Sequence, residues 1–384
     1  MPSVGRPIRV KVGTNHRSYP EKRNLFSLPF QRYEVTKIWD LYQFANVLHW
    51  KVLGRINWRL NFTHSDAVLG SLLYRDIQLL HFVNSISTSK KPWVTSFETL
   101  LPRYYDVRED DLAPLAAPSC RRLIAFSQCA YDFQVRHTRE RFPRYAAEIE
   151  KKLAVLHPPQ EVLLSDVRNR AYLNGGRLTL TLAGTDLTRK GLIEVLDALE
   201  ILVQRGYPVA LNLIGEVTAI DYPYRVTTEQ ARAIEARIAS KRWINHLTRT
   251  SNDNVLAIMR CTDVGLLPSY QDTYGYSVLE LQASGCPVVT TNIRALPEIN
   301  CAASGWIIEL PLTDDREMRI RSPADVEDAR DAVREGLVTT IQAIFEDPSQ
   351  LERRGASAIE FVRSNHSPNE NARYLEALYD SILQ

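Results

Sequence analysis

The sequence predicts an α/β protein with two doubly wound parallel sheets, each in its own domain. In the C-terminal half, short β-rich apolar runs such as 178–183 and 209–214 alternate with segments of helical spacing such as 192–203. This alternation is typical of a parallel sheet covered by helices. The chain has 384 residues, which is enough for two domains of ordinary size.

The N-terminal half repeats the alternation less regularly. We expect strands at 8–12, 77–83, 93–97, 122–126 and 153–156, and helices at 66–74, 128–141 and 145–152. Residues 15–63 are aromatic and basic and predict no regular element.

Two consecutive prolines, Pro158 and Pro159, break the chain after the last of these strands. We therefore expect an N-terminal domain of residues 1–165 and a C-terminal domain of residues 166–365. Residues 366–384 are expected to form an amphipathic helix that can pack on either domain, including a return to the N-terminal one.

The composition is that of a soluble globular protein, with 24% charged and 45% apolar residues. The net charge of +2 is unevenly spread, because residues 1–60 carry eleven Lys and Arg against three Asp and Glu. That segment is either a solvated surface or a basic face for an anionic membrane or a phosphate-bearing acceptor. Nucleic acid is not expected as a partner, because no recognisable binding module accompanies the charge.

The cysteine pattern and the hydropathy indicate a cellular location. The five cysteines include no Cys-x-x-Cys pair, which favours a reducing compartment. The N-terminus lacks the apolar core of a signal peptide, and no window approaches 18 apolar residues. We expect a cytoplasmic protein, with peripheral contact to the inner face of a membrane through its basic N-terminal region.

The most informative stretch runs from 263 to 299. An apolar strand stops at Pro268, a loop carries Asp272, and Gly275 opens a helix that holds Glu280. Glu280 lies about five residues inside that helix, roughly 7–8 Å along its axis. The free backbone N–H groups at the helix start lie between the two carboxylates and attract an anion. A diphosphate with a hydroxyl-rich group on each side fits this pattern, and such a ligand is a nucleotide-sugar.

A second turn follows the strand that ends at Gly184. Arg189 and Lys190 stand at the start of the next helix, where the helix dipole disfavours cations. A bound phosphate would remove that conflict, and Lys190 is the stronger candidate for the contact. Signatures of P-loop, dinucleotide, zinc-protease and serine-hydrolase sites are absent from the sequence, as is any Asp-x-Asp pair. Charge on a leaving diphosphate would then be stabilised by Lys, Arg and helix N-termini.

These motifs resemble those of family 4 glycosyltransferases of the GT-B fold. The resemblance rests on Asp272-x7-Glu280, on the run 281–289, on Leu296-Pro297-Glu298 and on Lys190-Gly191, and it covers residues 176–310. It implies two Rossmann-like domains facing a central cleft. It further implies transfer of a sugar from a UDP- or GDP-sugar with retention of configuration, without a bound metal or other cofactor. The acceptor is expected to be a saccharide or a lipid-linked intermediate of polysaccharide or glycolipid biosynthesis, and the basic N-terminal region is the sequence feature that supports this.

The resemblance and the strand ends together give the candidate site residues. The donor-binding candidates are Gly13, Gly184, Thr185, Arg189, Lys190, Tyr274, Gly275, Tyr276, Ser277 and Glu280. The catalytic candidates are Asp272, Glu98 and His81, with Glu98 and His81 open to a purely structural role.

The chain departs from the family pattern at three of these positions. Asp272 replaces the usual Glu, Thr185 stands where Arg is common, and Glu98 stands where a His is usual. Two other functions therefore stay open beside transfer: a nucleotide-sugar epimerase, and a non-catalytic protein that binds a nucleotide-sugar.

Overall fold

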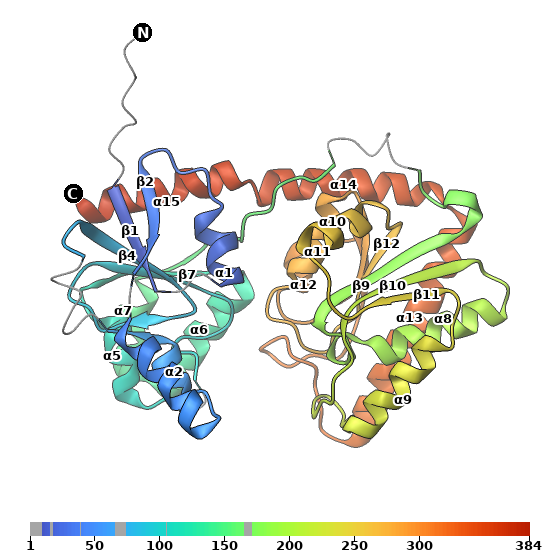
Figure 1. The fold of residues 1–384 in the computed structure, drawn as a ribbon, viewed down its shortest axis with the longest axis horizontal. Helices are drawn as coiled ribbons and strands as arrows, with labels where there is room; N and C mark the ends of the chain where they lie inside the picture. The colour runs from blue at the N-terminus through green and yellow to red at the C-terminus, as the bar shows by residue number, and fades with distance from the viewer. Residues whose placement is uncertain (1–9, 16–17, 39, 66–73, 105, 165–170) are drawn as a thin grey trace, which may run out of the picture. The chain divides into compact units, whose positions relative to one another are not determined.

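The computed structural model describes all residues outside 1–9, 16–17, 39, 66–73, 105 and 165–170. The chain forms two compact units (Figure 1): unit 1 is residues 1–159 with 366–384, and unit 2 is residues 160–365. The division thus falls before the 165/166 boundary expected from the sequence, and the C-terminal residues belong to unit 1. The helix expected at 66–74 lies almost wholly outside the described residues.

Unit 1 is built on a six-stranded parallel sheet with the strand order β2-β1-β4-β6-β7-β8. Its strands are β1 (Val10–Thr14), β2 (Tyr33–Lys37), β4 (Ile77–Val83), β6 (Trp93–Phe97), β7 (Cys120–Ala125) and β8 (Leu153–Val155). Every residue of β6 is buried, as expected for a parallel strand covered on both faces. Two short strands, β3 (Thr63–His64) and β5 (Ile86–Ser87), pair separately.

The helices of unit 1 include three that the sequence did not predict within residues 15–63. These are α1 (Tyr19–Glu21), α2 (Leu41–Leu53) and α3 (Trp58–Asn61), and a π-helical turn (Lys22–Phe26) follows α1. The other α-helices in the described residues of unit 1 are α5 (Ala113–Ala116), α6 (Gln128–Arg141), α7 (Pro143–Glu150) and the C-terminal α15 (Pro368–Leu383).

Helix α15 ties the end of the chain to its beginning. Tyr379 is fully buried, and its ring lies 5.0 Å from that of Tyr33 in β2. The Glu376 carboxylate accepts the backbone N–H groups of Gln31 and Arg32, at 2.7 and 2.8 Å. The last helix therefore completes the core of unit 1.

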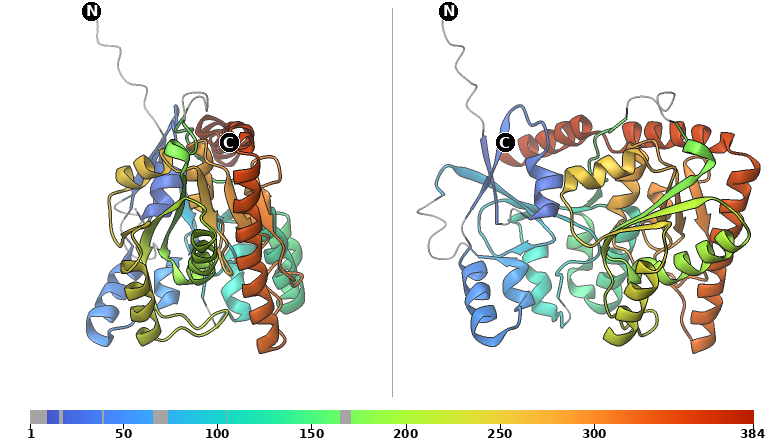
Figure 2. Two further views of the ribbon diagram at one scale, coloured as in Figure 1. Left: turned by 90° about the vertical axis from the view of Figure 1, so that its right-hand side faces the viewer. Right: turned by 45° about the vertical axis from the view of Figure 1, so that its right-hand side comes forward.

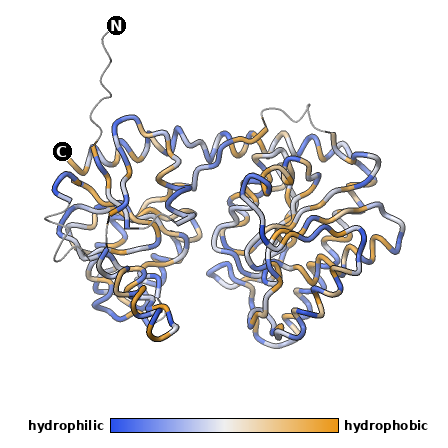
Figure 3. The backbone as a smooth tube through the Cα atoms, in the orientation of Figure 1, coloured by the Kyte–Doolittle hydropathy of each residue, from blue (hydrophilic) through white to orange (hydrophobic). Residues whose placement is uncertain are grey.

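Unit 2 has a second six-stranded parallel sheet, with the order β11-β10-β9-β12-β13-β14. Its strands are β9 (Leu178–Asp186), β10 (Val209–Glu216), β11 (Ile244–Leu247), β12 (Val264–Leu267), β13 (Val288–Thr291) and β14 (Gly305–Ile308). Hydrophobic residues gather in these strands (Figure 3).

Helices lie on both sides of the unit 2 sheet (Figure 2). They are α8 (Leu192–Gln204), α9 (Thr228–Ala239), α10 (Asn252–Arg260), α11 (Tyr276–Ala283), α12 (Leu296–Ile299), α13 (Pro323–Glu346) and α14 (Ser349–Asn365). Capping boxes begin two of them, at Thr227 before α9 and at Ser322 before α13, because each side chain satisfies an otherwise free N–H of the first turn. The sheet and its helices form the doubly wound arrangement that the sequence predicted.

Candidate functional site

The site candidates of unit 2 gather where the strand order of the sheet reverses. The chain proceeds from β9 outward to β10 and β11, and then returns to place β12 on the other side of β9. In open α/β sheets, ligands bind at such a switch point, outside the carboxyl ends of the strands. The loops after β9 and β12 are therefore adjacent, and they are the two turns that the sequence singled out.

The loop after β9 packs closely on the loop after β12. Gly191 has a φ of +84°, and a Cβ there would lie 2.4 Å from the carbonyl oxygen of Pro268. Gly184 lies under the Lys190 side chain, since a Cβ at residue 184 would lie 2.1 Å from the Lys190 Cε. Glycine at these two positions lets the loops touch and lets Lys190 extend across β9.

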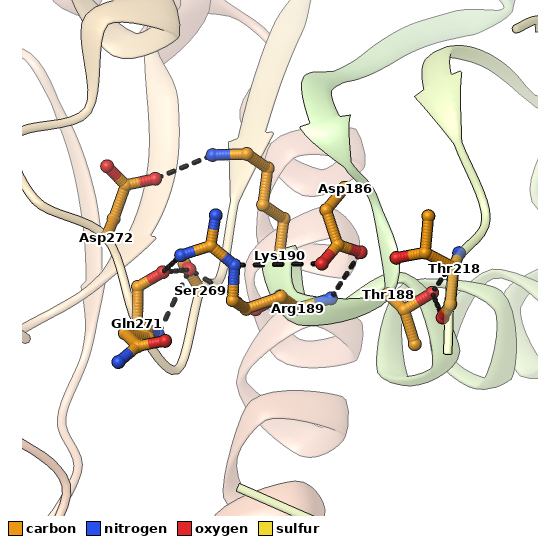
Figure 4. A network of polar contacts seen from close by, with 8 residues as sticks. All are labelled: Asp186, Thr188, Arg189, Lys190, Thr218, Ser269, Gln271 and Asp272. Atoms are coloured by element: carbon orange, nitrogen blue, oxygen red, sulfur yellow. Dashed lines mark hydrogen bonds and ion pairs between the residues drawn. The ribbon is translucent and has the colours of Figure 1, made fainter. Parts of the chain in front are cut away.

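Lys190 and Asp272 form an ion pair that joins the two loops (Figure 4). The Lys190 Nζ donates to Asp272 Oδ2 at 2.6 Å, and each side chain is only 11% exposed. Asp272 Oδ1 accepts the backbone N–H of Tyr274 at 3.2 Å, which bends the chain towards the start of α11. The structure thus brings together two residues that are 82 positions apart in the sequence.

Arg189 lies beside this pair. Its Nη1 donates to the Gln271 carbonyl at 3.4 Å, and its Nε is 3.8 Å from Asp186 Oδ2. The Ser269 hydroxyl lies within reach of the same carbonyl, at 2.9 Å, and accepts the Gln271 N–H. The Ser269 carbonyl in turn accepts from Thr291 Oγ1 at 2.6 Å. Asp186, Ser269 and Gln271 were not predicted as site residues, because each acts by holding a loop, which no local motif reveals.

The start of α11 lies directly after this loop. Gly275 is its N-cap, with a φ of +95°, and no side chain caps the first turn. Tyr276 and Ser277 open the helix and are partly exposed, whereas the Tyr274 side chain is fully buried. The contact of Tyr274 with Asp272 is therefore made by its backbone N–H, whereas its ring is buried.

The remaining donor-site candidates of unit 2 are Glu280 and Thr185. Glu280 lies in the second turn of α11 and is partly exposed. Thr185 is exposed within β9, which continues to Asp186.

A buried carboxylate belongs to a network of contacts that joins the loop after β12 to two helices. Glu194, in the first turn of α8, is 1% exposed and accepts from Arg330 Nε of α13 at 2.8 Å. It also accepts from the Tyr224 hydroxyl, whose ring packs edge-on against that of Tyr270 in the loop after β12. Burial raises the pKa of Glu194, an effect opposed by the hydrogen bond from Arg330. The network links α8, α13 and the Asp272 loop.

The structure supports His81 and Gly13 only as structural residues of unit 1. His81 is fully buried, and hydrogen bonds join its two ring nitrogens to Tyr379 and Ser96 at 2.6 and 2.9 Å. Burial lowers the pKa of His81 to about 3, so the ring is neutral and is not offered to a substrate. Gly13 lies inside β1 and not after it, and a Cβ there would meet Ile38 at 2.9 Å.

Glu98 follows β6 and so stands at the carboxyl edge of the unit 1 sheet, where ligands bind in this type of fold. It is 7% exposed and accepts from Arg103 Nη1 at 3.1 Å. Its backbone N–H donates to Asn84 Oδ1, just after β4. Glu98 therefore remains a candidate, with Arg103 as a partner that the sequence did not indicate.

Two features are absent from the described residues. In that part of the chain, no group of three or more His, Cys, Asp and Glu has the arrangement of a metal site. No helix formed by those residues is both long and apolar enough to cross a bilayer.

Replacing Gly184 by Ala is expected to lower the rate of the sugar transfer that the motifs imply by about 10- to 100-fold, with little change in stability. The new methyl group meets the flexible end of Lys190 and displaces its ammonium from the site. Initial rates and denaturant unfolding measure the two effects. The contrasting variant is Gly215→Ala, whose Cβ would lie 1.8 Å from the Gly184 carbonyl oxygen at a φ of +140°. It should cost about 1–3 kcal/mol of stability. An unchanged transfer rate in Gly184→Ala would contradict this role of Lys190.

Replacing Glu194 by Gln is expected to lower the free energy of unfolding by about 1–3 kcal/mol. Arg330 would keep its positive charge but lose the buried carboxylate that pairs with it. The matched control is Glu327→Gln. Glu327 contacts the same guanidinium at 3.2 Å but is 65% exposed, so its loss should cost less than about 0.5 kcal/mol. Urea unfolding of both variants checks the difference, and equal losses would rule out the supporting role of Glu194.

Part of the chain is similar to known proteins in sequence. Residues 166–335 match the family described as glycosyl transferases group 1. The chain is 26% identical over 184 residues to a glycogen synthase of Mycobacterium tuberculosis, covering 46% of this chain and 36% of that protein. It is 28% identical over 142 residues to a D-inositol 3-phosphate glycosyltransferase of Corynebacterium efficiens, covering 34% of each. The match thus spans about a third of the length of these curated relatives.

The solved structures extend the likeness to both units. Anabaena Alr3699/HepE, solved in complex with UDP and glucose, aligns with a TM-score of 0.61 at 14% identity, covering 97% of this chain and all of that one. At this identity the likeness establishes the fold, which is GT-B. Residues 166–335 are thus similar to the glycosyl transferases group 1 family, and the likeness of the whole chain to solved structures is one of fold.

Proposed function

We propose that the protein is a retaining glycosyltransferase that moves a sugar from a nucleotide-sugar to an acceptor hydroxyl without a bound metal or other cofactor. The observation that carries this proposal is the Lys190–Asp272 pair beside the start of α11, at the switch point of the unit 2 sheet. A diphosphate at this place meets an ammonium group and the positive end of a helix dipole. The match of residues 166–335 to the glycosyl transferases group 1 family favours transfer over the epimerase and over the non-catalytic binding protein.

Different residues of the site contact different parts of the donor. The diphosphate competes with Asp272 for the Lys190 ammonium, so donor binding frees the Asp272 carboxylate to accept from a sugar hydroxyl. Glu280, farther along α11, accepts from the ribose hydroxyls, and Arg189 adds a second positive charge. The bond from the anomeric carbon to the phosphate oxygen breaks and a bond to the acceptor oxygen forms. The products are the glycoside, a nucleoside diphosphate and one proton, and Glu98 is the candidate that accepts this proton.

The donor and acceptor are proposed by chemical class. A UDP-sugar is the first donor to test, because Alr3699/HepE was solved with UDP and glucose, and GDP-sugars are the alternative. The acceptor is a saccharide or a lipid-linked intermediate of polysaccharide or glycolipid biosynthesis. The excess of cations in residues 1–60 supports peripheral contact with an anionic membrane, and the cysteine pattern supports a cytoplasmic location.

A thermal-shift panel of UDP, GDP and their sugar conjugates tests the donor site. A ligand present at 100 times its dissociation constant adds about 2.7 kcal/mol of stability, so a genuine donor raises the melting temperature. Incubation of the identified donor with and without saccharide acceptors then separates transfer from its rivals. An altered sugar in the absence of acceptor would indicate an epimerase, and binding with no transfer to any acceptor would indicate a binding protein.

A further inference from the structure

Helix α2 and the turn that follows it expose a concentration of large apolar side chains. Of the eleven large hydrophobic side chains that are exposed in the described part of the chain, eight lie within residues 44–58. They are Phe44, Val47, Leu48, Trp50, Val52, Leu53, Ile56 and Trp58, and we call them the α2 patch. Isolated exposed apolar residues are normal, but a contiguous group indicates a binding surface.

Helix α2 exposes apolar side chains and buries a polar one, whereas a helix that covers a core does the reverse. Its polar residue Asn46 is buried, whereas Phe44, Val47 and Val52 are between 51% and 71% exposed. The Asn46 side chain donates to Asn61 Oδ1 at 3.1 Å and accepts the Asn57 N–H at 2.8 Å. Polar contacts thus hold α2 against α3, while six large apolar side chains of α2 remain exposed.

The ends of α2 are also fixed by local contacts. The Asp40 side chain caps the N-terminus by accepting the Tyr42 N–H at 2.8 Å, and Gly54 ends the helix in the left-handed conformation. The helix packs against α3 and β3. The outward apolar face is therefore a property of a well-defined helix.

The charged residues of the segment that carries the α2 patch are all cationic. Residues 41–65 contain Lys51, Arg55 and Arg59 and no Asp or Glu. Lys51 and Arg55 are exposed, while Arg59 pairs with Asp111 at 2.6 Å. A second copy of the chain, docked by the same face in a symmetric dimer, would bring these cations against each other. A surface of anionic lipid accepts both the apolar side chains and the cations.

We propose that the α2 patch docks unit 1 onto an anionic lipid surface. Its aliphatic and aromatic side chains enter the interface, and Lys51 and Arg55 contact the head groups. Trp50 and Trp58 have the amphipathic rings that are enriched at such interfaces. The docking is thus assigned to the apolar face of a single helix, which goes beyond charge attraction by the basic N-terminal region.

A pocket joins this surface to the carboxyl edge of the unit 1 sheet. It has a volume of about 310 Å³ and is lined by Lys37, Ile38, Asp40, Gln43, Phe44 and Val47. Phe44 and Val47 belong to both the pocket and the α2 patch, and Lys37 ends β2. Ligands of doubly wound sheets bind at this edge. If the proposed transfer is correct, a lipid-linked acceptor can present its polar head here while its chain stays in the membrane.

Vesicle flotation of the full-length protein tests the docking. The probes are vesicles of phosphatidylcholine alone and of phosphatidylcholine with phosphatidylglycerol. We expect binding to the anionic vesicles, and about a tenfold or greater loss of partitioning in the double variant Val52→Ser/Leu53→Ser, because aliphatic carbon no longer enters the interface. Lys51→Glu/Arg55→Glu should lose binding to the anionic vesicles. The matched control is Ile320→Ser, which removes an exposed apolar side chain of unit 2 and should leave partitioning unchanged.

The outcomes are separable. Unchanged flotation of the Val52→Ser/Leu53→Ser variant would overturn the proposal. The proposal would also be overturned if the unchanged protein did not float with the anionic vesicles. A sedimentation coefficient that falls in the Val52→Ser/Leu53→Ser variant would then indicate that the patch joins two copies of the chain. Calorimetric binding of UDP-sugars to the same variants tests the donor site independently. If the protein floats with vesicles but binds no nucleotide-sugar, the docking proposal stands and the proposed transferase function is wrong.

Discussion

Replacing Lys190 by Ala is expected to lower the rate of sugar transfer by roughly 100- to 1,000-fold. The ammonium group is the cation that the two loops hold at the switch point, paired with Asp272 at 2.6 Å. Without it, charge that develops on the leaving diphosphate loses its nearest stabilising group. Initial rates of nucleoside diphosphate release, measured with donor and acceptor in excess, give the size of the loss.

Two further variants separate this effect from a general loss of charge. Lys190→Arg keeps a cation in the site and should recover part of the rate. Lys241→Ala removes a lysine that pairs with Glu200 at 3.0 Å on the helical surface of unit 2, and it should transfer at the normal rate. A Lys190→Ala protein that transfers sugar as fast as the Lys241→Ala control would exclude Lys190 from catalysis.

Replacing Glu280 by Ala is expected to weaken donor binding by about 10- to 100-fold. The proposed hydrogen bonds from ribose hydroxyls end on a carboxylate, and a hydrogen bond to a charged group contributes about 1.5–3 kcal/mol. Isothermal titration with the nucleoside diphosphate alone isolates the contact from the sugar. The control is Glu298→Gln, because Glu298 already pairs with Arg316 at 3.1 Å in a neighbouring turn. Equal affinities for the Glu280→Ala protein and this control would exclude the ribose contact.

The sequence predicted the fold of unit 2 and the two loops of its site because these features are encoded locally. An apolar run stopped by Pro268, a polar loop and a glycine at the helix start are contiguous in the chain. Parallel strands align their carboxyl ends, so two such loops become neighbours when the strand order reverses between them. The Lys190–Asp272 contact follows from that topology, although its geometry required the structure.

The features that the sequence missed depend on distant partners. His81 is satisfied by Tyr379, 298 positions away, so its burial is invisible locally. Gly13 is set by packing against side chains of β4 and of the segment after β2. Helix α2 escaped prediction because its apolar residues, among them Phe44, Trp50 and Leu53, occur around the whole helix and leave no single apolar stripe to mark its period.

The departures at positions 185 and 272 acquire a physical context from the structure. Thr185 is exposed in β9, while Arg189 carries a guanidinium to the loop that holds Asp272. Asp272 is shorter than Glu by one methylene, and the Lys190 ammonium reaches it at 2.6 Å across Gly184. In the proposed donor site, Arg189 and Lys190 therefore both lie beside the loop of Asp272.

The most direct test is a crystal structure of the protein with a bound UDP-sugar, or with the GDP-sugar that the thermal-shift panel selects. The account predicts the diphosphate at the start of α11, with Lys190 Nζ turned from Asp272 to a phosphate oxygen and Glu280 bonded to the ribose. A nucleotide bound elsewhere, with the Lys190–Asp272 pair still closed, would contradict it.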